Sequence, residues 1–427
     1  MPFRFVHTAD LHLDSPLRSL ALKNVELAEL VRGATRTALS SIVDLCIAEA
    51  VDALLIAGDL YDGSQTSMNT ALFLSTELRR LEQAGIPVFI IRGNHDSQST
   101  IKRELSLPAN VHLFSGRIKS VRAKTLDNGR EVYVHGVGFD NPHAPESLLS
   151  SFAGPMADAI NIGMLHTSLA GAPGHDPYAP ASVADLAAHG FDYWALGHVH
   201  LRQVHSEKPV IVMPGMPQGR DINEAGDKSV TLVTVGDNGT IFHEERRIGQ
   251  AAFHRLSVEL TGADDWQAML ARVRAAIADA RDKIYAEQLI FRIVLTGTTS
   301  LAWSLRRDPE FLQAEISNVT AGFPGCWAEA VEVSCRNAES DATQSAADPV
   351  HELALTVHGD VLGSHAFRQE AERIVEELLA QLPRELREQM AGDEAALGRL
   401  VETVSREGSD DMLAYLQAGR ADGEGAR

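Results

Sequence analysis

Four short stretches of the sequence place metal-binding side chains directly after an apolar segment that reads as a β-strand. They have the patterns DxH, GDxxD, GNHD and HxH, and their polar residues are Asp10 and His12, Asp59 and Asp62, Asn94, His95 and Asp96, and His198 and His200. A fifth apolar segment ends in His166. In layered α/β folds, ligands bind outside the carboxyl ends of the strands. The sequence therefore predicts that these side chains gather at one edge of the fold.

The residue types fit a centre of two divalent metal ions better than any other kind of site. A carboxylate can bridge two cations, while imidazoles and an amide oxygen complete coordination spheres that suit Mn, Fe and Zn. The cysteines, Cys46, Cys326 and Cys335, lack CxxC spacing, which disfavours a structural zinc site and favours buried thiols. Each motif alone occurs often by chance, since GNHD can be a plain turn and HxH a surface strand pair. The interpretation depends on all five occurring in order, each at a strand end.

The elements that must position these residues alternate between short apolar strands and amphipathic helices, which indicates an α/β fold. A helix is predicted where Leu39, Ile42, Val43 and Cys46 recur at helical spacing. Strands are expected at residues 3–7, 53–57, 87–91, 131–136, 160–166, 193–198, 210–215 and 230–235. So many strands exceed one small open sheet, and we expect two packed sheets flanked by helices.

The character of the sequence changes from about residue 251. Residues 251–335 read as a small α+β unit without a cluster of His and Asp, and residues 336–349 are polar and low in complexity, which is typical of a linker. Helices follow in residues 350–427. The clearest has an apolar stripe of Phe367, Ala371, Ile374, Val375 and Leu378, and a second is centred on Leu397, Leu400, Val401 and Val404.

The overall charge limits the partners that the chain can bind. A formal net charge of -20 and a pI near 5.3 argue against a general polyanion-binding surface, because contacts with phosphate depend mainly on Lys and Arg. Any role with nucleic acid must therefore be local, supported by bound metal or by a partner subunit. The sequence shows neither a membrane-spanning apolar run nor a signal peptide after Met1, so we expect a cytoplasmic protein without membrane contacts.

The ordered motifs DxH, GDxxD, GNHD, H and GHxH resemble those of the calcineurin-like metallophosphoesterases, over residues 1 to about 250. Within that family, "HTADLHLDSPLRSL", "GDLYD", "ALGHVHLRQV" and "PGMPQGRDINEAGDKSV" look like the DNA double-strand-break repair nuclease branch, which includes the bacterial SbcD and YhaO-type exonucleases. The resemblance implies a two-sheet αββα sandwich at residues 1–250. It also implies a capping domain at 251–335, a linker at 336–349 and partner-binding helices at 350–427.

The resemblance also implies roles for single residues. It implies that one metal ion is bound by Asp10, His12 and His200, that the second is bound by Asn94, His166 and His198, and that Asp59 bridges the two. His95 would stabilise the pentavalent phosphorus or protonate the leaving oxygen, and Asp62 would orient its imidazole. Some nucleases of this branch have His at the position of Asp62, whereas the Asp here matches the bacterial members and the wider family. His7 and Asp14 are equally compatible with supporting a ligand and with ordinary capping, and Asp96 is expected to cap the next turn.

The implied function is a manganese-dependent exonuclease acting on DNA ends, with some endonuclease activity and with Fe or Zn compatible with the same ligands. The C-terminal helices would bind an SMC-like ATPase, and homodimer formation stays open. One alternative is a phosphoesterase for a small substrate, such as a cyclic nucleotide or a nucleotide-sugar, which the acidic pI favours mildly. The other is a non-catalytic scaffold for an ATPase, against which the presence of all seven ligand positions and His95 speaks.

Overall fold

The computed structural model describes residues 2–15, 25–63, 67–97, 107–138, 144, 146–169, 178–337, 349–382, 387 and 390–424. The chain divides into two compact units. Unit 1 comprises Met1–Arg255, Arg281–Phe291 and Gly325–Glu329, and unit 2 comprises Leu256–Ala280, Arg292–Pro324 and Ala330–Arg427. Among the helices of the described residues, none has the length and apolar composition needed to cross a membrane.

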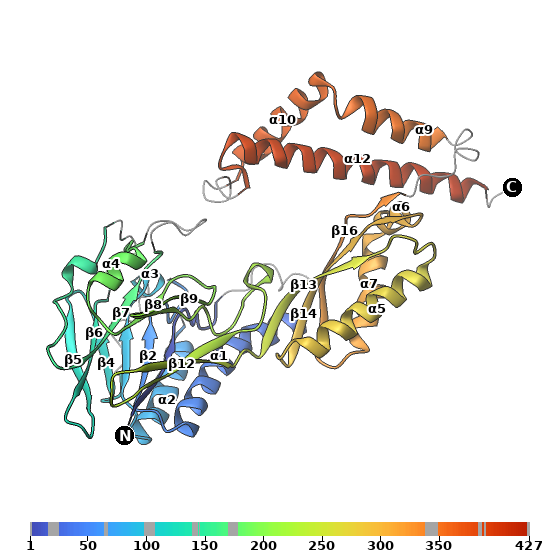
Figure 1. Cartoon of the computed structure of the whole chain (residues 1–427). Coiled ribbons are helices and arrows are strands. Elements are labelled where there is room, and N and C mark those ends of the chain that lie inside the picture. The colour runs from blue at the N-terminus through green and yellow to red at the C-terminus, as the bar shows by residue number, and fades with distance from the viewer. Residues whose placement is uncertain are drawn as a thin grey trace. The chain divides into compact units, whose positions relative to one another are not determined.

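Within the described residues, unit 1 contains two six-stranded sheets (Figure 1). The first has the order β12-β11-β1-β2-β3-β4, with bounds Ile241–Arg247, Ser229–Val235, Phe3–Thr8, Ala53–Ala57, Val88–Ile91 and Val111–Phe114. The second has the order β5-β6-β7-β8-β10-β9, with bounds Lys119–Thr125, Glu131–Gly136, Ile160–His166, Tyr193–Gly197, Val210–Met213 and Gln203–Glu207. Strands β1 to β4 pair in parallel, and so do β6, β7, β8 and β10. Their carboxyl ends therefore lie at common edges of the two sheets.

Apolar side chains alternate between the two faces of each sheet and fill three layers of core. The faces that meet between the sheets bury Phe5 and Phe89 from the first sheet and Ile162 and Tyr193 from the second. The outer face of the first sheet is covered by α1 (Val25–Ala48) and α2 (Met68–Gln83), and that of the second by α4 (Val183–Ala188). This helix, sheet, sheet, helix order confirms the αββα sandwich that the sequence predicts, with every predicted strand present.

The remaining elements form two smaller sheets with their helices, followed by a helical tail at residues 349–424. In the part of the chain that the structure describes, β13 (Ala251–Glu259), β14 (Gln288–Thr296) and β16 (Cys326–Val333) form a three-stranded sheet, beside α5 (Trp266–Lys283) and α7 (Pro309–Ala321). The short strands β15 (Thr298–Thr299) and β17 (Arg336–Asn337) pair in parallel, and α6 (Ala302–Arg307) follows β15. The domain limits expected at residues 250, 335 and 349 stay predictions, and residues 338–348 of the expected linker lie outside the described residues.

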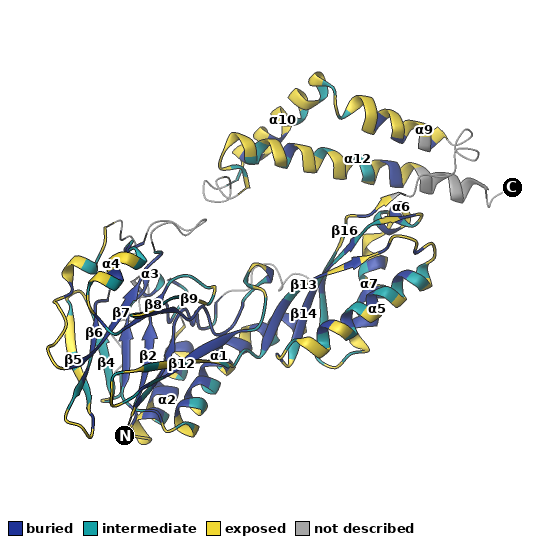
Figure 2. Cartoon of the chain, viewed as in Figure 1, coloured by how far each residue is buried: buried dark blue, intermediate teal, exposed yellow. Residues whose placement is uncertain are grey.

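The tail consists of α9 (Pro349–Thr356), a π-helical turn at Val357–Val361, α10 (His365–Ala380) and α12 (Glu394–Glu424). Figure 2 shows that much of its surface is exposed. The predicted stripe on α10 is only partly covered, since Val375 is buried against Val401 of α12 whereas Ile374 and Leu378 are exposed.

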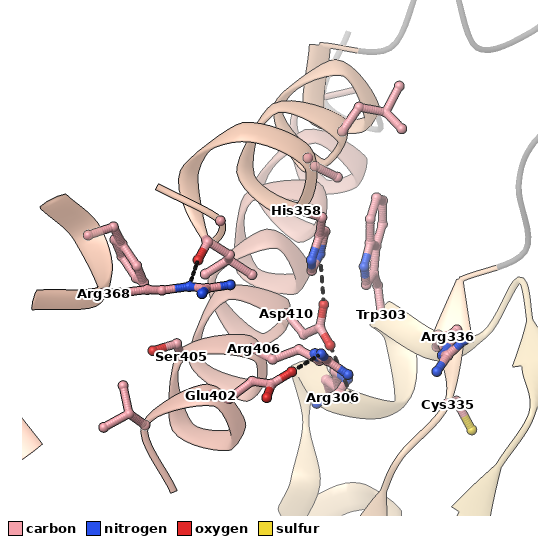
Figure 3. A pocket seen from close by; sticks show the side chains of 18 of the residues that line it. Trp303, Arg306, Cys335, Arg336, His358, Arg368, Glu402, Ser405, Arg406 and Asp410 are labelled. Atoms are coloured by element: carbon pink, nitrogen blue, oxygen red, sulfur yellow. Dashed lines mark hydrogen bonds and ion pairs between the residues drawn. The ribbon is translucent and has the colours of Figure 1, made fainter. Parts of the chain in front are cut away.

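The tail also packs on α6 within unit 2. Leu413 and Ala414 of α12 are buried against Trp303. A cavity of about 970 Å³ lies beside this contact, and Figure 3 shows Asp410 of α12 between His358 and Arg306. The Asp410 carboxylate is 3.1 Å from His358 Nε2 and 3.5 Å from Arg306 Nη2. Among the described residues, the tail is therefore held against α6 by an apolar cluster around Trp303 and by a small polar network.

We expect Leu413→Ala to weaken this attachment by about 2–5 kcal/mol, the usual effect of truncating a fully buried leucine. Hydrogen exchange should become faster in α6 and in the facing part of α12. Leu416→Ala is the matched control, because Leu416 is exposed on the same helix. Unchanged exchange in the Leu413 variant would contradict the described packing.

Candidate metal centre

The carboxyl ends of five parallel strands bring the predicted ligands of unit 1 together. Asp10 and His12 follow β1, Asp59 follows β2, and Asn94 begins α3 (Asn94–Ser97) just after β3. In the second sheet, His166 is the last residue of β7, and His198 and His200 follow β8. All seven predicted ligands therefore lie where the two sheets end side by side.

The loops that present these ligands have a strained backbone. Asp10, His12, Asp59 and His198 have φ angles of 53°, 42°, 53° and 98°. Such left-handed conformations cost about 1–3 kcal/mol per non-glycine residue and are found mainly where the surrounding structure imposes them. Here the first two loops hold one another, since Asp10 N donates to the Gly58 carbonyl at 3.0 Å and His12 N to the Asp59 carbonyl at 3.1 Å.

Two glycines of the motifs allow the loops to approach so closely. A Cβ atom on Gly58 would lie 2.4 Å from Nδ1 of His166, and one on Gly93 would lie 2.2 Å from Oδ1 of Asp59. Both distances are far below van der Waals contact, and the groups met are rigid parts of the site. The glycines of GDxxD and GNHD are therefore required by the packing of the ligands themselves.

The first group of ligands consists of Asp10, His12 and His200, whose ligand atoms all lie within 4.8 Å of one another. The Nε2 atoms of His12 and His200 face each other at 3.2 Å. The Asp10 carboxylate accepts a hydrogen bond from the amide of His198 at 3.1 Å, which holds it against the second sheet. Asp10 and His12 are completely buried.

The second group surrounds Asn94 Oδ1, which lies 3.0 Å from His166 Nε2 and 3.2 Å from His198 Nδ1. Asp59 lies between the two groups, because its Oδ2 is 3.3 Å from His166 Nε2 and 3.9 Å from His12 Nε2. Its other oxygen accepts a hydrogen bond from the amide of His95 at 3.0 Å. A carboxylate in this position can reach an ion in either group.

The chemistry of this donor set fits divalent cations. His166 Nδ1 donates to the carbonyl of Ala57 at 2.9 Å, which leaves its Nε2 lone pair directed at the oxygens of Asp59 and Asn94. Nδ1 of His12 is buried and has no hydrogen-bond partner among the described residues. Several acceptor atoms thus converge at short range, an arrangement that a cation between them stabilises.

The electrostatics of the two carboxylates differ. Burial raises the pKa of Asp10 to about 6. Burial also acts to raise the pKa of Asp59, but the positive charge and hydrogen bond of protonated His166 prevail and hold it below the ordinary range. With a cation in the site, the cation would supply this charge and His166 Nε2 would be free of its proton. Asp59 is therefore ionised at neutral pH and carries the negative charge that a shared cation site needs.

His95 and Asp62 form a separate pair at the more open side of the centre. Nδ1 of His95 lies 3.0 Å from Oδ1 of Asp62, and the His95 side chain is 40% exposed. Ser15 Oγ donates to the other oxygen of Asp62 at 2.6 Å, and the hydrogen bond with Asp62 raises the pKa of His95. Asp62 Oδ1 is also 3.8 Å from His12 Nδ1, so His12, Asp62 and His95 form a third group with metal-ligand spacing. The partly exposed imidazole of His95 can contact a substrate bound at the centre.

Three other polar residues singled out in the sequence have structural partners. His7 is buried between the sheets, where its Nδ1 accepts from the Tyr193 hydroxyl at 2.9 Å and its Nε2 donates to the Leu196 carbonyl at 3.0 Å. Asp14 forms an ion pair with Arg36 of α1. Asp96 accepts hydrogen bonds from the amides of Gly93 and Tyr61, which fixes the turn after β3 to the loop after β2.

The sequence analysis did not assign Tyr178, Arg220 and Glu224, which also border the centre. The ring of Tyr178 stacks on His198 with centroids 5.3 Å apart, and Glu224 Oε1 lies 2.8 Å from His200 Nδ1. Arg220 and Glu224 belong to the stretch "QGRDINE", which follows β10. The rule that predicted the ligands, polar residues after a parallel strand, also applies to this stretch.

Comparison with known proteins identifies the family. The family model "Calcineurin-like phosphoesterase" matches residues 3–202, and "Metallophosphoesterase YhaO, middle domain" matches residues 253–336. The chain is 35% identical over 315 residues to "Uncharacterized metallophosphoesterase YhaO" of Bacillus subtilis, covering 73% of this chain and 76% of that protein. The chain belongs to the calcineurin-like metallophosphoesterases. It is therefore a phosphoesterase that depends on divalent metal ions.

More distant relatives support the resemblance to the DNA repair branch. "DNA double-strand break repair protein Mre11" of Saccharolobus solfataricus is 27% identical over 223 residues, and that of Sulfurisphaera tokodaii is 28% identical over 204 residues. The alignments cover 50% and 47% of this chain, and 54% and 50% of those proteins. The chain thus spans only about half the length of these two relatives.

Asp59→Ala should abolish phosphodiester hydrolysis and reduce bound metal well below the wild-type content, because one carboxylate serves both ligand groups. Metal content is measured by elemental analysis of the purified protein, and activity with a small phosphodiester. Asp44→Ala is the control, since Asp44 is largely exposed and pairs with Arg80 away from the centre. Full metal occupancy with normal turnover in the Asp59 variant would refute the shared-ligand assignment.

Proposed function

We propose that the protein is a two-metal phosphodiesterase that acts as an exonuclease on DNA ends, with some endonuclease activity. The observation that carries the proposal is the position of Asp59 between two ligand groups, with the His95–Asp62 pair beside them on the more exposed side. Two cations and one proton donor close to one another suit a displacement at phosphorus.

The proposed ligands follow the two groups. Asp10, His12 and His200 would hold one ion, Asn94, His166 and His198 would hold the other, and Asp59 would contribute to both sites. The ions, when bound, supply Lewis-acid charge that lowers the pKa of water and neutralises the charge developing on the phosphate. Manganese is the proposed metal, and this mixed set of oxygen and nitrogen ligands also suits iron and zinc.

In this proposal His95 acts on the leaving oxygen. Asp62 holds Nδ1 of His95 and stabilises the imidazolium, so that Nε2 faces the substrate with a proton. A hydroxide ion derived from water forms a new bond to phosphorus as the bond from phosphorus to the sugar oxygen breaks. The electrons of the broken bond remain on the sugar oxygen, which takes this proton from Nε2. The imidazole is then neutral, and a proton from solvent restores it.

The preference for DNA is supported by the relatives named for double-strand-break repair and by the resemblance of several motifs to that branch. We further propose that an SMC-like ATPase binds the tail and supplies the basic DNA-binding surface that a chain with a net charge of -20 does not supply as a whole. Ile374 and Leu378, exposed on one side of α10, are proposed contact residues for that partner. The cytoplasmic location and the option of a homodimer stay predictions of the sequence.

The proposed function is tested by comparing hydrolysis of end-labelled linear duplex DNA, covalently closed circular duplex DNA and small phosphodiesters, each with Mn²⁺, Fe²⁺ or Zn²⁺. An exonuclease on DNA ends should degrade the linear duplex with Mn²⁺ and leave most closed circles intact. Efficient hydrolysis of a cyclic nucleotide or nucleotide-sugar without DNA degradation would instead identify a small-substrate phosphoesterase. Metal binding without any hydrolysis would favour a scaffold role.

His95→Ala should retain metal and substrate binding but lose about 10²–10⁴ in rate, the range expected for loss of a general acid. Asp62→Ala should lose part of that amount, because it removes the partner of the imidazole and not the imidazole itself. Turnover and metal content are measured on the same preparations, with His243→Ala as control, since His243 pairs with Glu207 on a different face of unit 1. Loss of metal from the His95 variant would assign His95 to the ligands.

Deletion of residues 350–427 should leave metal binding and hydrolysis of a small phosphodiester intact, because the metal centre lies entirely within unit 1. It should abolish co-purification with an SMC-like ATPase and weaken the processing of long duplex DNA. The comparison uses full-length and shortened protein expressed with the candidate ATPase. If the shortened protein loses activity on the small substrate, the tail is required for the active fold and the partner proposal loses its basis.

A further inference from the structure

We infer that Arg220 is a positioning residue for two histidines of the metal centre. It orients the ligand His200 through Glu224, and it orients the proton donor His95 through Asp62. The inference rests on the phosphodiesterase function proposed above and extends it to residues beyond the ligand motifs. Its basis is that one guanidinium group lies against two carboxylates, each of which holds a different histidine of the site.

On one side, Arg220 fixes Glu224. Nη2 of Arg220 donates to Glu224 Oε1 at 2.6 Å, Nε donates to Oε2 at 3.2 Å, and the Arg220 amide donates to the same Oε2 at 2.8 Å. This forked contact leaves the carboxylate a single orientation. Glu224 Oε1 accepts from Nδ1 of His200 at 2.8 Å, which places the lone pair of His200 Nε2 towards His12. Carboxylate partners of this kind orient metal-binding histidines.

On the other side, Arg220 faces Asp62. Its Nη1 is 3.7 Å from Asp62 Oδ2 and 3.4 Å from Ser15 Oγ, which itself donates to that oxygen. The other oxygen of this carboxylate, Asp62 Oδ1, lies 3.0 Å from Nδ1 of His95. One chain of contacts from His200 to His95 therefore runs through Glu224, Arg220 and Asp62, and a second runs through His12 and Asp62.

The loop that carries Arg220 is rigidly held. Gln218 is buried, its Oε1 accepts from the amides of Gln250 and Ala251, and its Nε2 donates to the carbonyls of Gly219 and Ala251. Ile222, within a short 3₁₀ turn, is buried against α1 and against the start of β13. Because the loop is held at Gln218 and at Ile222, the Arg220 side chain starts from a fixed backbone position. Catalysis requires such fixed positions, since small displacements of reacting groups lower the rate strongly.

A lysine cannot replace this arrangement, because an ammonium group is a point charge and lacks the planar fork that reaches two carboxylates. Arg220→Met should therefore disturb two properties at once, metal affinity through Glu224 and leaving-group protonation through Asp62. Glu224→Gln should disturb mainly the first, and Asp62→Asn mainly the second. A residue that only stabilises the fold would not change metal affinity and leaving-group protonation in this pattern, so the combined effect distinguishes a positioning role from a purely structural one.

The test measures Mn²⁺ affinity by calorimetry and turnover of two substrates at saturating Mn²⁺. Thymidine 5′-(p-nitrophenyl) phosphate has a leaving group that needs little protonation, whereas the sugar oxygen of the dinucleotide TpT needs a proton. We expect Arg220→Met to weaken Mn²⁺ binding by about 10–100-fold, as loss of a partner of a ligand does. We also expect kcat to fall at least about 10-fold more for TpT than for the nitrophenyl ester, since general-acid catalysis contributes about 10²–10⁴-fold. Added guanidinium should restore part of both losses in Arg220→Ala.

Arg4→Met is the matched control, since Arg4 also donates to a carboxylate, that of Glu49, but away from the centre. If Arg220→Met does not fold, Arg220→Lys carries the same test and should show both losses in weaker form. Loss of only one property, equal loss on both substrates, or no rescue by guanidinium would overturn the inference. If the wild-type protein hydrolyses neither substrate, the proposed function itself fails, which is a different result from a wild-type-like Arg220 variant.

Discussion

The fold of unit 1 has to keep two carboxylates, Asp10 and Asp59, buried beside each other at the carboxyl ends of its strands. An ionised carboxylate away from water is strongly unfavourable unless hydrogen bonds and positive charge compensate for it. Backbone amides provide part of that compensation, since those of His198 and His95 donate to Asp10 and Asp59 respectively. The remaining compensation comes from the imidazoles around them and from the cations that this donor set fits. The sheets, loops and glycines of the site have to bring these groups within reach.

The two-sheet architecture meets this requirement because parallel strands from both sheets end at the same place. The first sheet contributes Asp10, His12, Asp59 and Asn94 from three loops, and the second contributes His166, His198 and His200, so neither sheet alone assembles a complete ligand group. The interior between the sheets is apolar and tightly packed, with Phe5 against Tyr193, and it fixes the distance between the two sets of ligands. The left-handed backbone of Asp10 and Asp59 is the local strain that accompanies this arrangement, and it is sustained by hydrogen bonds that amides of the loop after β1 donate to carbonyls of the loop after β2.

The sequence allowed much of this to be predicted, because ligand identity and strand-end position are both local properties. Asp59 and Asn94 follow apolar strands directly, and their type already indicates metal chemistry. Strands such as β5 and β12 were not predicted, since their side chains are largely polar and exposed and lack a clear apolar signal. The place of Glu224 after a parallel strand fits the rule that predicted the ligands, but its contact with His200 could not be predicted, because that contact depends on how a loop folds back over the centre. The burial of Leu413 against Trp303 likewise depends on packing between segments far apart in the chain.

The central claim is that Asp59 lies between two metal ions, and a crystal structure of the protein soaked with Mn²⁺ tests it most directly. Anomalous diffraction at the manganese edge locates and counts the ions without reference to activity. We expect two peaks in unit 1, one bound by Asp10, His12 and His200 and the other by Asn94, His166 and His198, each within bonding distance of an oxygen of Asp59. A single peak at saturating Mn²⁺, or two peaks of which one is bound by His95 and Asp62 away from Asp59, would contradict it.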